Sequence, residues 1–251
     1  MKTMYRLVVM IFAVVALLAL SMPVQASKMD NSIESSAKKS YVFQTYLKAD
    51  DIKVKSEDGA VTLTGTVAEE SHKSLAQDTV ADIPGVKSVD NKLEVKGTPP
   101  AKMSDAWITA KVKTMFLFHR NVSAMTEIST KDGIVILQGK TADEAQKDLT
   151  TEYAKDVEGV KGVKNEMTVG KIAKKKQTVG QKIDDASITA QVKMTLLYHR
   201  STSALNTSVK TTHGVVTLSG KAKSGAEMDL AAKFANDVNG VKSVNNRMTI
   251  N

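Results

Sequence analysis

The chain has 251 residues, with no cysteine, four prolines and a formal net charge of +8 at pH 7. Because disulfides are ruled out, each folded unit has to be held together by its own apolar core. Most of the excess positive charge lies in residues 170–183, which carry five lysines and no acidic residue, and the last part of the chain carries a smaller share. A single basic connector between nearly neutral segments argues against a protein built around a nucleic-acid groove.

Residues 1–26 have the three-part layout of a secretory signal peptide. Lys2 and Arg6 stand at the start, and an apolar run follows over residues 7–20. This run is shorter than the roughly 20 residues that a helix needs to cross a bilayer. We therefore predict export and cleavage after Ala26, and a membrane anchor is the alternative. No cysteine follows the apolar run, so we do not expect a lipoprotein.

One unit occurs three times in the rest of the chain, with copies 74 and then 81 residues apart. Each copy contains three glycines spaced by 6 and then 20 residues, and each ends in a similar run of eleven residues: GVKSVDNKLEV, GVKGVKNEMTV or GVKSVNNRMTI. The repeated glycines, which we expect to be structural, are Gly59, Gly65, Gly85, Gly133, Gly139, Gly159, Gly214, Gly220 and Gly240. Units of this length can form a small domain with one core. We predict three domains, at residues 36–97, 104–169 and 184–251, with a basic linker at 170–183.

Each copy begins with an amphipathic helical segment. In the third copy, Ile188, Val192 and Leu196 lie four residues apart on one face, and Asp185 stands just ahead of them. A carboxylate at that position can cap free backbone N–H groups, and Asp105 has the same place in the second copy. The first copy is about five residues shorter between this segment and its first glycine, so we expect a truncated first helix or connector there.

Two strands, a second helix and a last strand follow in each copy. The dipeptides Asp58-Gly59 and Asp132-Gly133 favour a tight hairpin between the first two strands, because glycine accepts a positive φ, and His213-Gly214 is a weaker version. The second helix ends near the third glycine, where a left-handed cap is usual, and the repeated eleven residues form the last strand. The sequence therefore predicts an α+β fold of three tandem αββαβ domains, each a three-stranded sheet covered on one face by two helices.

Asn91, Asn165 and Asn246 occupy the same position in the last strand of each copy. The alternation of the strand places them on its apolar face, where an unpaired amide would cost about 1–3 kcal/mol. We expect each of them to have a structural role, as a hydrogen bond to a nearby backbone turn.

The motifs DGAVTLTG, DGIVILQG and HGVVTLSG, each followed by a helix and the repeated last strand, resemble those of the BON domain. This family is named for bacterial osmotically inducible periplasmic proteins and nodulation proteins, and the resemblance covers nearly all of the chain beyond residue 36. It implies a periplasmic or envelope protein that attaches to phospholipid surfaces and serves under osmotic or other stress. The familiar stress-induced member has two such domains, so a third is a departure.

The sequence offers no catalytic or metal-binding motif. His119 and His199 share a repeat position near the end of the first helix, each followed by arginine. A cationic group there interacts favourably with the helix dipole, and we favour this role over a metal site. No HExxH, cysteine cluster, EF-hand loop, phosphate loop or nucleophile motif is present. We expect no enzyme activity, no cofactor and no metal.

The candidates for surface binding are aromatic and basic residues of the first helices. Trp107 lies about 100° around its helix from the core stripe, and its counterpart is Ser187, so we expect Trp107 to be partly exposed. Phe118 and Tyr198 share a repeat position near the far end of the same helix, with Lys111 nearby. Such a set is typical of a membrane interface, and packing between domains is the equal alternative.

Lys174, Lys175 and Lys176 lie in the linker, and each could contribute about 1 kcal/mol near an anionic lipid surface. A solvated flexible linker is the alternative interpretation. Together these features predict a non-enzymatic periplasmic protein that binds anionic phospholipid membrane surfaces peripherally. The alternative is a chaperone-like module that binds envelope proteins. Nucleic acid is not an expected partner, because export removes the chain from the cytoplasm.

Overall fold

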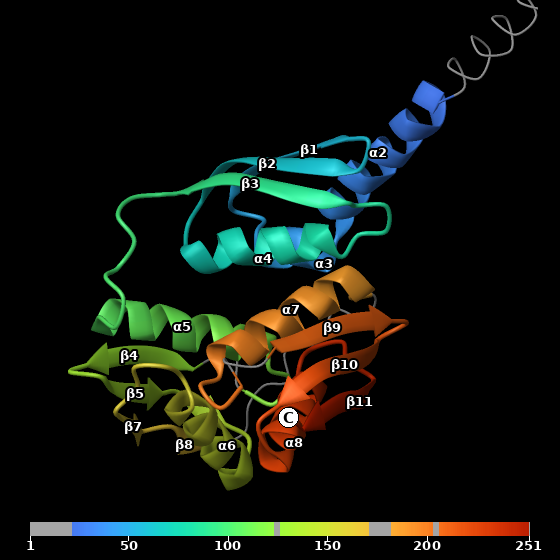
Figure 1. Ribbon diagram of the computed structural model, residues 1–251. Coiled ribbons are helices and arrows are strands. Elements are labelled where there is room, and N and C mark those ends of the chain that lie inside the picture. The colour runs from blue at the N-terminus through green and yellow to red at the C-terminus, as the bar shows by residue number, and fades with distance from the viewer. Residues whose placement is uncertain (1–21, 123–125, 171–181, 203–205, 251) are drawn as a thin grey trace, which may run out of the picture.

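The computed structural model describes residues 22–122, 126–170, 182–202 and 206–250. These residues form three units in chain order, each with helices packed on a small sheet (Figure 1). The first 21 residues of the predicted signal peptide lie outside the described residues, and so do Lys174, Lys175 and Lys176. In the part of the chain that is described, no helix is long and apolar enough to cross a membrane.

The elements repeat in the same order in the three domains. The first domain contains α2 (Met22–Lys39), α3 (Tyr41–Thr45), β1 (Asp51–Glu57), β2 (Ala60–Val67), α4 (Glu70–Ala81) and β3 (Ser88–Val95). The second contains α5 (Asp105–Phe118), β4 (Glu127–Lys131), β5 (Ile134–Gln138), β6 (Lys140–Thr141), α6 (Glu144–Lys155), β7 (Gly162–Asn165) and β8 (Thr168–Val169). The third contains α7 (Asp185–Tyr198), β9 (Asn206–Thr212), β10 (Val215–Ala222), α8 (Gly225–Asn236) and β11 (Ser243–Ile250).

Each domain has a three-stranded sheet with its second long strand at the centre. This strand is antiparallel to the first strand and parallel to the last, because the second helix crosses the sheet between them. Alternate residues of the central strand, such as Val61 and Leu63 in β2, are buried under the helices. In the second domain, β6 and β8 form a separate two-stranded extension. The predicted α+β fold is confirmed.

The hairpin turns place two successive residues in the left-handed region. The φ angles are 52° and 82° at Asp58 and Gly59, and the weaker dipeptide His213-Gly214 adopts 53° and 81°. Positive φ at both central residues is the requirement of a type I′ turn. The carboxylate of Asp185 accepts hydrogen bonds from the backbone N–H groups of His213 (2.7 Å) and Gly214 (2.8 Å). It therefore holds the turn, while the preceding Asp184 caps α7, a division of roles that differs from the sequence prediction.

The first domain begins ahead of residue 36, and its first helix is not truncated. Asp30 of α2 accepts hydrogen bonds from the backbone N–H groups of Asp58 (2.9 Å) and Gly59 (3.0 Å). The first aspartates of α5 and α7 make the same pair of bonds, so Asp30 aligns α2 with those helices. The prediction of a shortened helix or connector was wrong. α2 starts at Met22 and includes the predicted cleavage position at Ala26.

The first helix of this domain is interrupted at Ser40 rather than shortened. The Ser40 hydroxyl donates to the carbonyl of Ala37 (2.8 Å) and accepts from the backbone N–H of Phe43 (3.4 Å), which caps α3. The break separates α2 from α3, so a helical segment that is taken to start beyond Ser40 looks too short.

The three repeated asparagines join the last strand of each domain to its second helix. The side-chain amides of Asn91, Asn165 and Asn246 donate to the carbonyls of Lys73 (3.0 Å), Lys147 (3.0 Å) and Met228 (2.9 Å). Each side-chain oxygen also accepts from the backbone N–H two residues further on. The partner is a helix carbonyl rather than the backbone turn that we expected.

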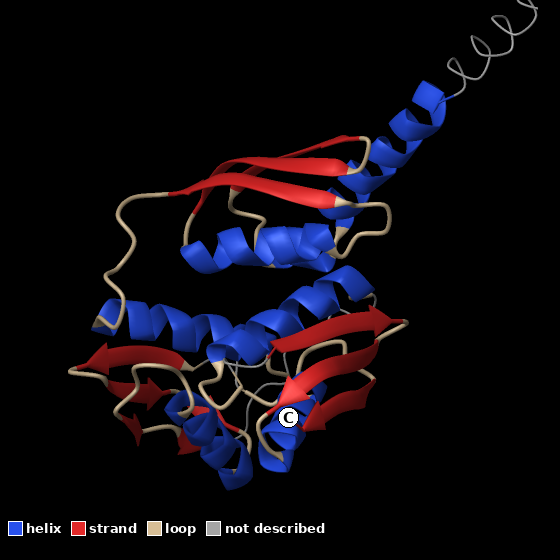
Figure 2. Cartoon of the chain, viewed as in Figure 1, coloured by secondary structure: helices blue, strands red, loops and turns tan. Residues whose placement is uncertain are grey.

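Helices fill the space between the domains. α4 of the first domain and α5 of the second both pack on α7 of the third. These helices lie between the sheet of the first domain and the sheets of the other two (Figure 2). Consequently ten of the 14 residues of α7 are buried, against six of 14 in the equivalent helix α5.

Replacing Asn246 by alanine should lower the free energy of unfolding by about 1–2 kcal/mol, because the Met228 carbonyl and the Met248 N–H lose their partner. Denaturant titration of the full chain measures this change. The neighbouring Asn245→Ala, on the exposed face of the same strand, is the matched control and should change stability by less than about 0.5 kcal/mol. Equal effects of the two substitutions would contradict the structural role of Asn246.

Candidate functional site

The second and third domains meet through equivalent surfaces. His119 forms an antiparallel bridge with Val238, and His199 forms the same bridge with Val157. His119 and His199 share one repeat position, and Val157 and Val238 share another. The contact is therefore isologous in the way of a two-fold symmetric dimer, although both halves belong to one chain.

Backbone and arginine hydrogen bonds fasten this contact on both sides. The backbone N–H of Arg120 donates to the carbonyl of Asp237 (2.9 Å), and that of Arg200 donates to the carbonyl of Asp156 (2.6 Å). The Arg200 guanidinium also reaches the carbonyl of Lys155 at 3.4 Å. The Arg120 guanidinium donates to three carbonyls at the end of α8 and beyond it, those of Asn236, Val238 and Val241. The arginine that follows each histidine thus serves as an interdomain clamp.

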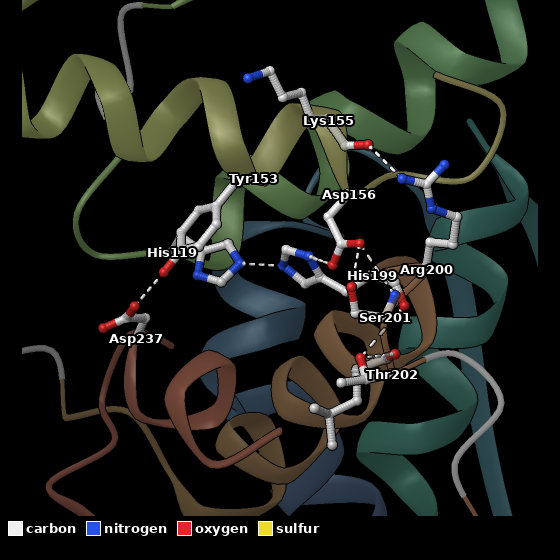
Figure 3. Close-up of polar contacts among 10 residues, drawn as sticks. His119, Tyr153, Lys155, Asp156, His199, Arg200, Ser201, Thr202 and Asp237 are labelled. Atoms are coloured by element: carbon white, nitrogen blue, oxygen red, sulfur yellow. Dashed lines mark hydrogen bonds and ion pairs between the residues drawn. The ribbon is translucent and has the colours of Figure 1, made fainter. Parts of the chain in front are cut away.

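The two imidazoles meet through their edges at the centre of this contact, with their planes 76° apart (Figure 3). Their Nε2 atoms are 3.1 Å apart, and the exposed fractions are 2% for His119 and 0% for His199. On the far side of His199, its Nδ1 lies 3.1 Å from Oδ2 of Asp156. The other Asp156 oxygen accepts from the hydroxyl (2.5 Å) and backbone N–H (3.1 Å) of Ser201. We call the two histidines, Asp156, Asp237 and Tyr153 the histidine network.

The hydrogen bonds determine the position of each imidazole hydrogen. The Asp156 carboxylate only accepts, so Nδ1 of His199 carries a hydrogen; burial lowers the pKa of this ring and keeps it neutral, so its Nε2 is an acceptor. His119 must then donate from Nε2, which leaves its Nδ1 as a bare acceptor. Consistently, Nδ1 of His119 is one of the few buried polar atoms without a partner among the described residues. Both rings are neutral in this arrangement.

The two halves of the network differ at one aromatic position. Tyr153 of the second domain donates its hydroxyl hydrogen to Oδ2 of Asp237, whereas the equivalent residue of the third domain is Phe234. The Phe234 ring stacks on His199 at 3.7 Å between centroids. Because the Asp237 carboxylate accepts the hydrogen bond from Tyr153, it does not pair with His119 in the way that Asp156 pairs with His199.

Burial controls the charges in the network. Loss of solvent, with smaller contributions from His199 and Lys233, lowers the pKa of His119 to about 3. Burial also lowers the pKa of His199, although Asp156 opposes that shift. Burial alone would raise the pKa of Asp156, but hydrogen bonds from His199 and Ser201 keep it below its usual value. The prediction of cationic histidines at a helix end was wrong, because each ring is covered by the neighbouring domain.

The network has the chemistry of a domain contact with titratable groups. In the described segments of the chain, no group of three or more His, Cys, Asp or Glu side chains could hold a metal ion.

Sequence reasoning missed Asp156 and Asp237, although a signal was present. An aspartate stands three residues ahead of the last repeated glycine in all three copies, at Asp82, Asp156 and Asp237.

The predicted surface residues fall into two groups. Trp107 is partly exposed, and the Lys111 ammonium lies 4.2 Å from the centre of its ring while it also pairs with Glu158 (3.1 Å). Phe118 and Tyr198 are instead 1% and 9% exposed. The packing alternative therefore describes these two aromatic residues, whereas Trp107 is partly exposed.

Packing between domains explains why Phe118 and Tyr198 are covered. Phe118 packs edge-to-face against Tyr46 of the first domain, with 5.4 Å between ring centroids. Tyr198, at the end of α7, lies under the Lys111 ammonium at 5.1 Å from its ring centre. Both rings therefore belong to the junction of the domains.

Trp107 and Ser187 differ because only one of their helices is covered. Ser187 is fully buried, and its hydroxyl accepts the backbone N–H of Val42 from the first domain (3.1 Å). Asp184 accepts the neighbouring N–H of Tyr41 (2.7 Å). The first domain thus sits on α7, and the equivalent surface of α5, with Trp107, is left partly open.

Comparison with known proteins places the fold in a family. The chain matches the BON domain over residues 29–97, 104–171 and 184–251. It is 35% identical over 189 residues to the osmotically-inducible protein Y of Escherichia coli (strain K12), and the aligned region covers 74% of this chain and 91% of that protein. It is 33% identical over 143 residues to an uncharacterised protein in the gshII 5′ region of Anaplasma centrale, with coverages of 57% and 91%.

Among solved structures, the chain is similar to CdsD, a structural protein of the type III secretion system of Chlamydia trachomatis. The TM-score is 0.24 and the identity 16%, with coverage of 84% of this chain and 90% of the other. For the periplasmic domain of PrgH the TM-score is 0.19 and the identity 13%, with coverages of 82% and 96%. The match of all three units shows that the chain belongs to the BON domain family and carries three such domains in tandem.

Proposed function

We propose that the protein is a non-enzymatic periplasmic envelope protein that binds anionic phospholipid surfaces and acts under osmotic stress. Support comes from the 35% identity to a protein that is named as osmotically inducible, and from the signal peptide that the sequence predicts. The structure contributes a candidate surface on the second domain.

The observation that carries the proposal is the difference between α5 and α7. The first domain covers α7, where Ala190 and Gln191 are fully buried. The equivalent residues of α5, Ala110 and Lys111, are partly exposed, as is Trp107 one turn earlier. We call the accessible side of α5, which consists of Ala106, Trp107, Ala110, Lys111, Lys113 and Leu117, the α5 face. It presents the one tryptophan of the sequence beside the exposed Lys113 and beside Lys111, whose ammonium pairs with Glu158.

Residues just ahead of α5 extend this surface. Met103 is 49% exposed, and the side chain of Lys102 is 70% exposed. An indole and a thioether among ammonium groups suit the boundary between lipid headgroups and acyl chains. Each lysine near an anionic surface contributes about 1 kcal/mol, less at higher salt. The resulting attachment is weak and reversible, and the lysines at 174–176 would add to it.

A chaperone-like role is the second candidate. Leu117 and Leu197 hold equivalent positions near the ends of α5 and α7, and they are 51% and 53% exposed. Exposed leucines at two repeated positions could contact apolar segments of an unfolded envelope protein. Tethered weak sites of this kind gain affinity through their linkage.

Replacing Trp107 by serine, the residue that α7 has at this position, should weaken binding to anionic vesicles about fivefold, because the indole no longer enters the interface. Co-sedimentation of the full chain with phosphatidylglycerol vesicles at low salt measures this. Neutral phosphatidylcholine vesicles should recover much less protein.

The matched control is Val215→Ser, which removes a 39% exposed apolar side chain from the third domain and should leave recovery unchanged. Equal recovery with neutral and anionic vesicles would contradict the proposal. Suppression of the aggregation of a denatured protein without added lipid would favour the chaperone-like role instead.

A further inference from the structure

We propose that the contact between the second and third domains is acid-sensitive, and that protonation of the His119–His199 pair opens it. The inference rests on the hydrogen positions and burial in the histidine network, and it is independent of lipid binding. Opening would expose apolar side chains that both domains now cover.

The pair has room for only one hydrogen between its rings. At 3.1 Å between Nε2 atoms, one nitrogen donates and the other accepts. A proton added to His199 must go to Nε2, because its Nδ1 hydrogen is already bonded to Asp156. Two N–H groups would then point at each other unless the His119 hydrogen moves from Nε2 to Nδ1, where it has no partner. Protonation of His199 therefore either replaces the central hydrogen bond by repulsion or leaves an unpaired buried N–H on His119.

A proton added to His119 is no easier to accommodate. It must go to Nδ1, which has no hydrogen-bond partner among the described residues. The ring packs against Tyr153 at 4.3 Å between centroids, and the Tyr153 hydroxyl already occupies Asp237. A buried cation without an acceptor is strongly unfavourable, so this proton also favours separation of the domains.

The charged groups around the pair come from every element that packs on it. The acids are Asp156 and Asp237, at the ends of α6 and α8, and the bases are Lys155, Lys233, Arg120 and Arg200. Asp156 favours a charged His199, while Lys233 opposes charge on both rings. Asp237 is shared between Tyr153 and Asn121. Burial therefore outweighs the one favourable carboxylate.

The direction of the pH effect follows from the lowered histidine pKa values. A histidine that titrates near 6.5 when exposed and stays neutral when buried stabilises the closed form above about pH 6.5. That contribution is lost progressively as the pH falls toward the pKa of the closed form. A histidine that stays neutral in the closed form raises the ratio of open to closed form about tenfold per pH unit below 6.5. His119, whose pKa is lowered to about 3, meets this condition, and His199 adds to the effect because burial lowers its pKa as well. Asp156, whose pKa is also lowered, adds its effect only below about pH 4.

Opening would uncover a substantial apolar surface. Tyr153 and Phe234 are 2% and 4% exposed, and Val157 and Val238 are fully buried. These side chains come from both domains and meet around the imidazoles. Opening of the contact at low pH would therefore expose aromatic and aliphatic side chains to solvent.

Spin labels on α6 and α8 test the proposal directly, because the chain has no cysteine of its own. Asp148→Cys and Asp229→Cys place labels at equivalent exposed positions of the two domains. Pulsed electron–electron double resonance should show one distance between the labels at pH 7.5. Between pH 6.5 and 4.5, a second population with a longer distance should grow. The same distance distribution from pH 7.5 to 4.5, or a change only below about pH 4, would overturn the proposal.

Two histidine variants assign the change. His119→Gln combined with His199→Gln should abolish the pH dependence of the distance, while His213→Asn, outside the contact, should leave it unchanged. Asparagine tolerates the positive φ of that turn position. If the double variant fails to fold, the pH midpoint of opening in the labelled parent chain decides the question. A midpoint between pH 6.5 and 4.5 supports the histidines, and one below about pH 4 contradicts them.

Tyr153→Phe tests why the two halves differ. It gives the second domain the aromatic residue of the third and frees the Asp237 carboxylate to accept a hydrogen bond from Nδ1 of His119. Protonated His119 then becomes stable in the closed form, so proton uptake on opening should fall by about one. This number is measured as the slope of the logarithm of the ratio of open to closed form against pH. An unchanged slope would show that Asp237 and His119 are not coupled.

Discussion

The burial of α7 is the constraint on which the arrangement of the three domains depends. At its start, Asp184 and Ser187 accept the first free N–H groups of α3 and so seat the first domain. Lys193, further along, pairs with Asp82 of that domain at 2.6 Å. At its end, His199 meets His119 of the second domain. One helix thus carries two different contacts, each built from polar groups that are costly to bury without a partner.

Repetition supplies three copies of one fold, and the differences between copies lie where domains touch. Serine at position 187 fits beneath the first domain, and tryptophan at the equivalent position 107 is partly exposed. Tyr153 and Phe234 differ within the second contact, which leaves one histidine with a carboxylate and the other without one. Such substitutions give the two halves of an almost symmetric pair of domains different contacts.

The fold could be predicted from the sequence because its determinants are local. Hairpin dipeptides, glycine caps and apolar alternation each act over a few residues, and all three copies repeated them. The contacts between domains could not be predicted in this way. The position of His119 at a helix end suggested a solvated cation, and Phe118 fitted a membrane interface and packing between domains equally well, because neither position shows which domain covers it. The break at Ser40 was missed for a related reason, since the expected spacing assumed one unbroken helix.

The central claim is that the first domain covers α7 and leaves the equivalent side of α5, around Trp107 and Ala110, partly open. Cysteines introduced one at a time at Ala190 and Ala110 test it most directly, since these residues are equivalent and the sequence contains no other thiol. Ala190 is fully buried, whereas Ala110 is partly exposed. Under native conditions a thiol reagent should modify Ala110→Cys readily and Ala190→Cys far more slowly. Equal rates at the two positions would contradict the account.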